Sequence, residues 1–217
     1  MKLLLTSSGL SNSTIIASLA RLYGSDFSQS TIVYIDTAAV PVIGHEIWSN
    51  EDKNKFINLK PKSFESIDIS KLTLEQIANQ LNGADIITVG GGNTAFLASW
   101  LDKLKLKSLF HQLLQTKIYI GISAGSQVTA NKLWLKDWGQ LYNEEVQVET
   151  DSGLGLVDFD VIPHLNSNWF TNLREEKVRQ LTSRTKTKAY ALDDDSAILI
   201  DNHQFSVVSE GDWLELN

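Results

Sequence analysis

The sequence predicts an α/β fold: a mainly parallel sheet flanked by helices on both faces, with short antiparallel strands near the C-terminus. Short apolar runs rich in β-branched residues alternate with stretches of helical spacing along most of the chain. Such alternation favours parallel strands joined by crossover helices. The final apolar runs follow one another without an intervening helix, which indicates an antiparallel edge or a small second sheet.

The first part of the chain alternates strands and helices. In order, we expect strand 2–6, helix 11–24, strand 30–36, helix 48–59, strand 62–69 and helix 73–83. Ser11 or Ser13 can cap the first of these helices, and Gly24 can end it. Thr73 is the expected cap of the helix that ends at Gly83.

The second part begins with two strand–turn–helix units and ends in strands. We expect the units over 84–104 and 117–133, then strand 155–165, helix 168–184, and strands 187–192, 196–202 and 204–209. The last two strands form a hairpin about 201–203. Because the three prolines are scattered and no linker or repeat interrupts the pattern, we expect a single α/β domain over residues 1–217.

The composition argues against several classes of function. Among the 217 residues there is no cysteine, which excludes a cysteine nucleophile and cysteine-ligated zinc or iron–sulfur centres. The net charge of −7 and the lack of a basic cluster argue against a nucleic-acid partner. No apolar run is long enough to span a membrane, and the N-terminal one is too short for a signal peptide. We expect a cytoplasmic protein.

The segment GISAG, residues 121–125, places Ser123 at the turn between a predicted strand and a predicted helix. A serine at such a turn has a strained backbone that lifts its hydroxyl clear of the sheet. Glycines on both sides remove side chains that would collide there. The helix that follows directs backbone N–H groups toward the serine. The segment predicts a nucleophile, and an ordinary strand-to-helix turn is the alternative.

A second glycine-rich turn, GGGNT at 90–94, also follows a strand. It matches neither of the common phosphate-binding patterns, and no lysine follows it. Bare glycine backbone can instead offer an N–H group to the charge that develops on a reacting carbonyl oxygen. Together with the N–H of Ala124, such a group would form an oxyanion hole. A plain glycine turn is the alternative.

Of the four histidines, His164 is the one expected at the carboxyl end of a strand. It follows Pro163, whereas His45, His111 and His203 fall in a loop, a helix and a hairpin turn. In an open α/β sheet, ligands bind at the carboxyl ends of the strands. We therefore expect His164 to be the base that activates the serine, although a lone histidine is more often structural.

A histidine base needs a carboxylate that fixes its tautomer and stabilises its charged form. The segment LDDDS at 192–196 supplies three carboxylates at the end of a strand. A solvated acidic turn and a weak Ca²⁺ or Mg²⁺ site are the alternatives. Asp137, which follows the predicted nucleophile helix, is the reserve candidate. If 193–195 continue a strand, Asp193 and Asp195 point away from Asp194.

With these motifs in this order, the chain resembles the peptidase E family of serine peptidases, the α-aspartyl dipeptidases. The resemblance rests on VGGGNTAFL, YIGISAGSQV, IPHLNSN, the helix segment at 174–176 and ALDDDSAI, and it runs over most of the chain. It implies a fold similar to class I glutamine amidotransferases and to flavodoxin. It also implies hydrolysis of short peptides with an N-terminal aspartate, without a metal or cofactor.

Carried over to this chain, the family's pattern makes Ser123 the nucleophile and His164 the base. Gly92 and Ala124 supply the N–H groups of the oxyanion hole. The orienting residue in the family is a glutamate, and Asp194 stands in its place, one methylene shorter.

The resemblance also makes Arg174 and Asn93 the expected substrate-binding residues. Arg174 matches the arginine with which the family reads the substrate's aspartate. The spacing from His164 to Arg174 is shorter than in the family, which bears on strict aspartate specificity. Arg174 could instead pair with a neighbouring carboxylate along its helix.

These expectations combine into a cytoplasmic serine hydrolase of small peptides. The expected partner is a small peptide substrate, with no nucleic acid and no membrane, and a homodimer is left open. Within the same fold, cleavage of β-aspartyl peptides as in cyanophycinase is the alternative activity. A catalytically silent ligand-binding relative is the alternative from another class of protein.

Overall fold

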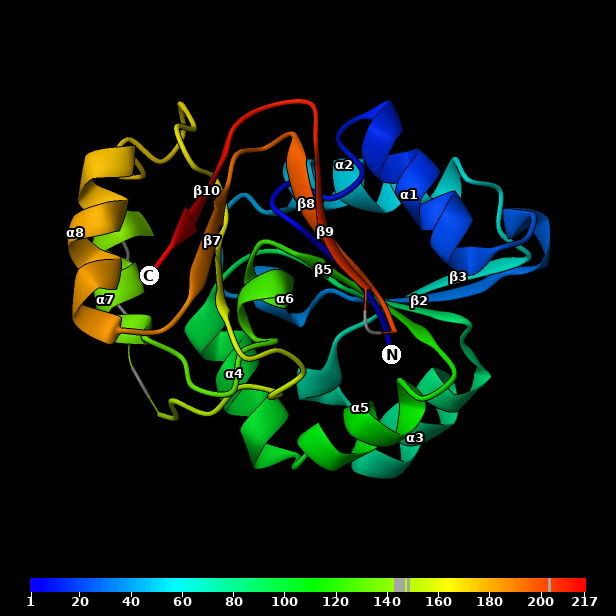
Figure 1. The fold of residues 1–217 in the computed structure, drawn as a ribbon. Helices are drawn as coiled ribbons and strands as arrows, with labels where there is room; N and C mark the ends of the chain where they lie inside the picture. Colours follow the sequence, from blue (N-terminus) through cyan, green and yellow to red (C-terminus); the bar gives the residue numbers. More distant parts are fainter. Residues whose placement is uncertain (143–146, 148, 203) are drawn as a thin grey trace.

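A seven-stranded sheet forms the centre of the computed structural model, which describes residues 1–142, 147, 149–202 and 204–217 (Figure 1). Its strand order is β3-β2-β4-β5-β1-β8-β9. The five strands from β3 to β1 are parallel, and β8 and β9 are added antiparallel at one edge. A three-stranded sheet, β10-β7-β6, stands beside it. The predicted fold class is confirmed.

The strands are β1 (Lys2–Thr6), β2 (Thr31–Ile35), β3 (Ser63–Ile67), β4 (Ile86–Val89), β5 (Ile118–Ile122), β6 (Asp160–Ile162), β7 (Ala189–Leu192), β8 (Ser196–Asp201), β9 (Gln204–Ser209) and β10 (Trp213–Leu216). The α-helices are α1 (Ser13–Tyr23), α2 (Glu46–Ile57), α3 (Leu74–Gly83), α4 (Thr94–Lys103), α5 (Lys107–Leu113), α6 (Ala124–Gln127), α7 (Leu135–Tyr142) and α8 (Glu175–Thr185). Short 3₁₀ turns lie at Phe27–Gln29, Thr37–Ala39 and Ile69–Lys71.

The alternation of side chains along the strands creates two apolar layers, one on each face of the large sheet. In β1, Leu4 faces one layer, whereas Leu3 and Leu5 face the other. Helices α1 and α2 cover the layer that contains Leu4, and α3, α4 and α5 cover the opposite face (Figure 1). Because both faces are covered, the central strands are almost continuously apolar and buried.

The smaller sheet stands beside helices α7 and α8 (Figure 1). Strands β6 and β7 pair in parallel, so their carboxyl ends lie at the same edge. The chain leaves β7 and enters β8 of the large sheet through residues 193–195, and β8 then pairs antiparallel with β1. This short crossing brings the end of the small sheet against the carboxyl end of β1.

Several local predictions need correction. The cap of α1 is Asn12, whose side chain accepts a 2.9 Å hydrogen bond from the Ile15 N–H, and neither Ser11 nor Ser13 fills that position. The helix after β5 is only α6, because the chain from Val128 onward turns to form β-bridges with residues 152 and 157. The helix predicted over 168–184 begins at Glu175. Strand β10 has no counterpart among the predicted elements.

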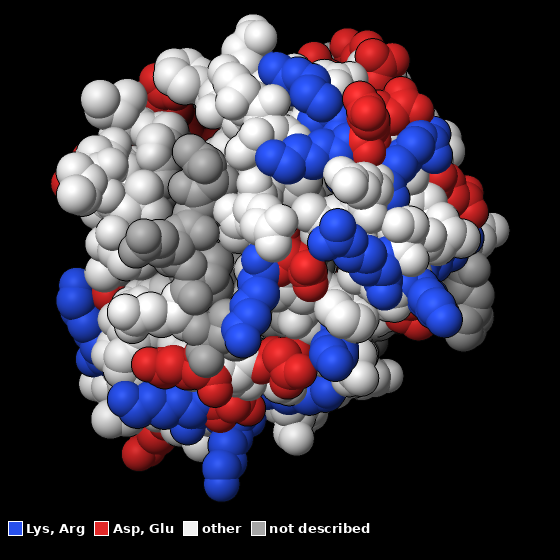
Figure 2. Space-filling view, turned by 90° about the vertical axis from the view of Figure 1, so that its left-hand side faces the viewer, with Lys and Arg blue, Asp and Glu red and all other residues white. Residues whose placement is uncertain are grey.

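On the face that carries α7 and α8, basic and acidic side chains are interspersed, without a continuous basic field (Figure 2). In the part of the chain that the structure describes, no helix is long and apolar enough to cross a membrane.

Candidate active site

Ser123 lies between the last residue of β5 and the first residue of α6, in a backbone conformation with φ 48° and ψ −108°. Positive φ is costly for a side chain with a Cβ atom. The conformation is held by the Ser123 N–H, which donates to the Thr6 carbonyl at 3.1 Å. The flanking glycines are required here, since a Cβ on Gly121 would lie 2.7 Å from the Ser126 nitrogen and one on Gly125 2.0 Å from the Val89 oxygen.

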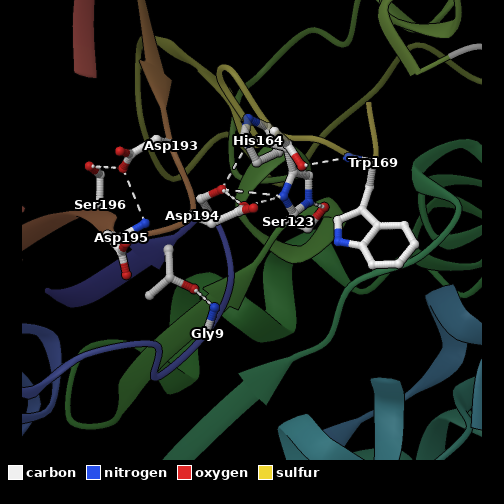
Figure 3. Close-up of polar contacts among 12 residues, drawn as sticks. Gly9, Ser123, His164, Trp169, Asp193, Asp194, Asp195 and Ser196 are labelled. Atoms are coloured by element: carbon white, nitrogen blue, oxygen red, sulfur yellow. Dashed lines mark hydrogen bonds and ion pairs between the residues drawn. The ribbon is translucent and has the colours of Figure 1, made fainter. Parts of the chain in front are cut away.

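His164 follows β6 and points its ring at Ser123 (Figure 3). Its Nε2 lies 2.9 Å from the Ser123 Oγ. The ring is stacked on that of Phe170, with centroids 4.9 Å apart, and its side chain is 14% exposed. His164 also has a positive φ of 67°. Phe170 thus supports one face of the His164 ring, and the ring's Nε2 faces the Ser123 hydroxyl.

Asp194 lies in the turn between β7 and β8 and completes a chain of three side chains (Figure 3). Its Oδ1 lies 2.6 Å from the His164 Nδ1. Burial alone would raise the pKa of Asp194. Hydrogen bonds from His164, Ser7 and Ser167, together with the charge of His164, outweigh burial and hold this pKa below its ordinary value. Asp194 is therefore a carboxylate at neutral pH, as the partner of an imidazolium must be.

The neighbouring aspartates have other partners. Asp193 accepts hydrogen bonds from the Ser196 hydroxyl and from the backbone N–H groups of Asp195 and Asp212, so it closes the turn. Residues 193–195 form a turn and no strand, so the predicted strand alternation does not apply, although Asp193 and Asp195 do contact groups other than His164. Asp137 lies in α7 and, within the described residues, makes no hydrogen bond or ion pair with His164, whose Nδ1 meets Asp194.

The two candidate oxyanion donors have backbones suited to that role. Gly92 has a φ of 131°, and a Cβ there would lie 2.2 Å from the Ala38 oxygen, so the position accepts only glycine. Ala124 is the first residue of α6. Within the described part of the chain, neither N–H group meets a backbone acceptor. The sequence predicted a longer helix after Ser123. Because α6 has only four residues, its dipole stabilises a negative charge near Ser123 less than a longer helix would.

The two candidate substrate-binding residues both make hydrogen bonds within the chain. Asn93 caps α4, and its Oδ1 accepts a 2.8 Å bond from the Phe96 N–H. Arg174 stands at the N-cap of α8, and its Nη1 donates to the carbonyls of Ser167 at 2.9 Å and Leu173 at 3.2 Å. The guanidinium thus reaches back toward the loop that carries His164.

Arg174 does not pair with its helix neighbours. Glu175 binds Arg179 at 2.8 Å, and Arg174 has no ion pair with a carboxylate of the described chain. The helical ion pair that the sequence offered as an alternative is therefore made by a different arginine.

Two of the remaining histidines contact backbone carbonyls. His45 Nδ1 lies 2.7 Å from the Val42 carbonyl, and His111 Nε2 lies 2.9 Å from the Leu154 carbonyl. His203 lies outside the described residues. No group of three His, Asp or Glu side chains that could hold a metal ion occurs in the ranges the structure describes.

Ser7, Ser167 and Phe170 also contact His164 or Asp194, and sequence reasoning missed all three. Ser7 directly follows β1, so its position at a strand end beside GISAG was the available signal. Ser167 lies in the motif IPHLNSN, which supported the resemblance without giving Ser167 a role, and Phe170 falls in the helix predicted over 168–184. Nothing in their spacing marks either residue as part of the site.

Known proteins of similar sequence and fold are peptidases. An uncharacterized peptidase of Pasteurella multocida is 26% identical over 181 residues, which cover 83% of this chain and 86% of the relative. An uncharacterized peptidase of Listeria monocytogenes is 27% identical over 179 residues, covering 82% and 85%. The crystal structure of a Listeria monocytogenes protein provisionally assigned as peptidase E superposes with a TM-score of 0.79 at 24% identity, covering 97% of this chain and 98% of that one.

The fold and these similarities define a hydrolase of the peptidase class. The chain belongs to peptidase family S51, whose family model matches residues 3–208. The relationship to the peptidase E family that the motifs predict is confirmed.

Proposed function

We propose that this peptidase is of the serine type and hydrolyses short peptides, with dipeptides that carry an N-terminal aspartate as its preferred substrates. The observation that carries the proposal is the position of the His164 ring. Its two nitrogens lie 2.9 Å from the Ser123 Oγ and 2.6 Å from the Asp194 Oδ1. A neutral ring with its proton on Nδ1 has a lone pair on Nε2 that can accept the serine proton.

The reaction proceeds through an acyl-enzyme. The Ser123 oxygen attacks the scissile carbonyl carbon as its proton moves to His164 Nε2. The tetrahedral intermediate collapses, the carbon–nitrogen bond breaks, and the leaving amine takes that proton from His164. Water, activated by the same ring, then attacks the ester and releases the acid and free Ser123. Asp194 stays ionised throughout and stabilises the imidazolium.

The oxyanion of the intermediate is bound by backbone N–H groups. Ala124 directly follows Ser123, and Gly92 follows Gly91, at which a Cβ would lie 3.3 Å from the Ser123 Cβ. Neither the Gly92 nor the Ala124 N–H has a backbone acceptor in the described chain. Donors fixed before the reaction stabilise the developing charge without reorganising.

The serine mechanism is tested with a fluorophosphonate probe, which forms a covalent bond only with an activated serine. We expect labelling of the wild type at Ser123, located by mass spectrometry. Ser123→Ala should abolish the labelling and the hydrolysis of a short-peptide panel while the protein stays folded, because the turn accepts a smaller side chain. Ser126→Ala, which removes a buried hydroxyl in the same helix, is the matched control for folding. Undiminished hydrolysis by Ser123→Ala contradicts the mechanism.

Arg174 is the proposed reader of the substrate's acidic side chain. Two observations support it: the guanidinium has no carboxylate partner in the described chain, and it contacts the loop that carries His164. Its planar fork can bind a carboxylate with two parallel hydrogen bonds. Nη1 donates to two carbonyls, and because Nη2 and Nε make no hydrogen bond within the described chain, both can bind the substrate.

Aspartate preference is tested with the dipeptides Asp-Leu, Asn-Leu, Ala-Leu and a β-aspartyl dipeptide. We expect the wild type to favour Asp-Leu. Arg174→Met should cost Asp-Leu roughly 2–4 kcal/mol of transition-state stabilisation and change Ala-Leu little, because only the acidic substrate loses a desolvated charge pair. Arg179→Met, which removes the arginine that pairs with Glu175, is the control. Equal wild-type rates on Asp-Leu and Ala-Leu would contradict the preference, and faster cleavage of the β-linked peptide would favour a cyanophycinase-like activity.

A further inference from the structure

Ser7 lies at the carboxyl end of β1, between the two segments that supply His164 and Asp194. Its side chain is fully buried. Its backbone N–H donates to the Ser196 carbonyl at 3.2 Å, which ties the end of β1 to the start of β8. The residue is thus fixed by the large sheet, whereas His164 follows a strand of the small sheet.

The Ser7 hydroxyl contacts both residues. It accepts a 2.8 Å hydrogen bond from the His164 backbone N–H and lies 3.1 Å from the Asp194 Oδ1. It also lies 3.5 Å from the His164 Nδ1, at the outer limit of a hydrogen bond.

The direction of each hydrogen bond follows from what the groups can do. A backbone N–H can only donate, so the Ser7 oxygen accepts from His164. An ionised carboxylate can only accept, so the single Ser7 proton points at Asp194. The His164 Nδ1–H points at the same Oδ1 at 2.6 Å. Two donors therefore converge on one carboxylate oxygen, and the Nε2 lone pair is left to face Ser123.

The backbone of His164 explains why such a support is needed. Its φ of 67° is unfavourable for a residue with a side chain. Conformations of this kind persist where surrounding contacts fix them. The Ser7 oxygen satisfies the His164 N–H in this conformation, and the Ser7 proton fixes the carboxylate that the ring must meet.

We propose that Ser7 is a positioning residue of the hydrolytic site, which joins the backbone of His164 to the carboxylate of Asp194 and sets their relative position. The inference rests on the proposed serine mechanism. Ser7 has no role in bond breaking: it acts on Ser123 only through the other two side chains.

The test measures the rate at which the fluorophosphonate probe labels Ser123 across a range of pH, so it needs no knowledge of the substrate. Ser7→Ala should slow labelling roughly 10- to 100-fold, the scale on which small misplacements of reacting groups act. In a plot of labelling rate against pH, the part where the rate falls toward acid pH, the acid limb, should also move to higher pH. Without the hydrogen bond from Ser7, the Asp194 carboxylate interacts more strongly with the imidazolium, and this interaction favours the protonated ring.

Two further variants separate positioning from packing. Ser30→Ala removes another fully buried hydroxyl, one that donates to the Phe27 carbonyl at 2.7 Å, and it should leave both the rate and the acid limb unchanged. Ser7→Cys keeps the shape but has a weaker donor and acceptor, so it should fall between the wild type and Ser7→Ala. Circular dichroism checks whether Ser7→Ala folds. If it does not, the labelling rate and the acid limb of Ser7→Cys test the proposal instead.

The outcomes are distinct. Slower labelling with a displaced acid limb in a folded Ser7 variant supports the proposal. A rate within about twofold of wild type, a difference worth less than 0.6 kcal/mol, overturns it. A slower rate with an unmoved acid limb also overturns it, since lost packing alone gives that result. A wild type that the probe does not label at Ser123 overturns the serine mechanism and the role of Ser7 together.

Discussion

At the scale of single residues, the carboxylate of Asp194 is the group on which the site depends. Its pKa is held below the ordinary value mainly by hydrogen bonds that outweigh burial. A depressed pKa in the folded state means that the stabilisation is present above the unfolded pKa and lost as pH falls through the folded one. The side chain is 41% exposed, so water screens part of this effect. Acid that protonates Asp194 should therefore remove this stabilisation together with the charged partner of His164.

Replacing this carboxylate tests its role. Asp194→Asn should lower turnover roughly 10³- to 10⁴-fold, because an amide favours the wrong tautomer of the ring and cannot balance the imidazolium. Probe labelling and peptide hydrolysis both measure the loss, and circular dichroism checks the fold.

Asp195→Asn is the matched control for Asp194→Asn. Its carboxylate lies at the outer limit of a hydrogen bond with Asn12, at 3.5 Å, so a mild effect is expected. Equal losses in the two variants would show that the acidic turn acts through its overall charge, and would leave Asp194 without its proposed role.

At the scale of elements, the site is made by strand ends that meet. Ser7, Ser123 and Gly92 follow β1, β5 and β4 of the large sheet, while His164 and Asp194 follow β6 and β7 of the small one. Glycine lets these segments approach. The backbone of Gly92 passes against that of Ala38, whose carbonyl accepts the Asn93 N–H at 2.7 Å.

Gly92→Ala should therefore damage both stability and activity. The new Cβ would meet the Ala38 oxygen at 2.2 Å and the Ala39 nitrogen at 2.7 Å, and backbone atoms cannot rotate away as a side chain can. We expect a lower melting temperature and a roughly 10²- to 10³-fold loss in kcat from the displaced N–H donor.

Gly83→Ala, at the end of α3, is the control for Gly92→Ala. A Cβ there meets nothing within 4 Å, so the variant should be neutral or slightly more stable. A Gly92→Ala protein with the melting temperature and kcat of the wild type would contradict the close approach.

The sequence predicted the site best where strands end in glycine or proline. It predicted least where contacts between distant segments determine the conformation. Glycine beside Ser123 and Pro163 before His164 predicted the turns that the structure contains. The start of α8 was missed because the apolar residues of 168–174 are spaced as in a helix, whereas this segment folds back through the contact of Arg174 with Ser167. Ser7 was missed for the same reason: its partners come from distant parts of the chain.

At the scale of the whole molecule, one buried carboxyl should set the pH dependence of stability near neutrality. Asp160 begins β6 and is 2% exposed, and its Oδ1 has no hydrogen-bond partner among the residues that the structure describes. Burial raises its pKa to about 7. The folded protein then holds a proton that the unfolded chain releases from about pH 4 upward, so stability falls as pH rises from about 4 to 7.

Asp160→Asn should remove this slope, which is worth at most roughly 4 kcal/mol. The free energy of unfolding, measured in urea at several pH values, is the readout. The wild type should lose stability from pH 5 to pH 7, and the variant should not. Equal slopes in the two proteins would show that Asp160 stays charged when folded. The same curves test the predicted single domain, which requires one cooperative transition.

The pairing of β8 with β1 has a consequence for how the protein is made. A ribosome delivers Ser123 first, then His164, and the acid at 194 later still. Strand β8, which emerges after that acid, then pairs antiparallel with β1, which was synthesised before all three residues. Under the proposed mechanism, a growing chain therefore carries its nucleophile in an idle form. Hydrolytic competence arrives only when these later residues pair with β1.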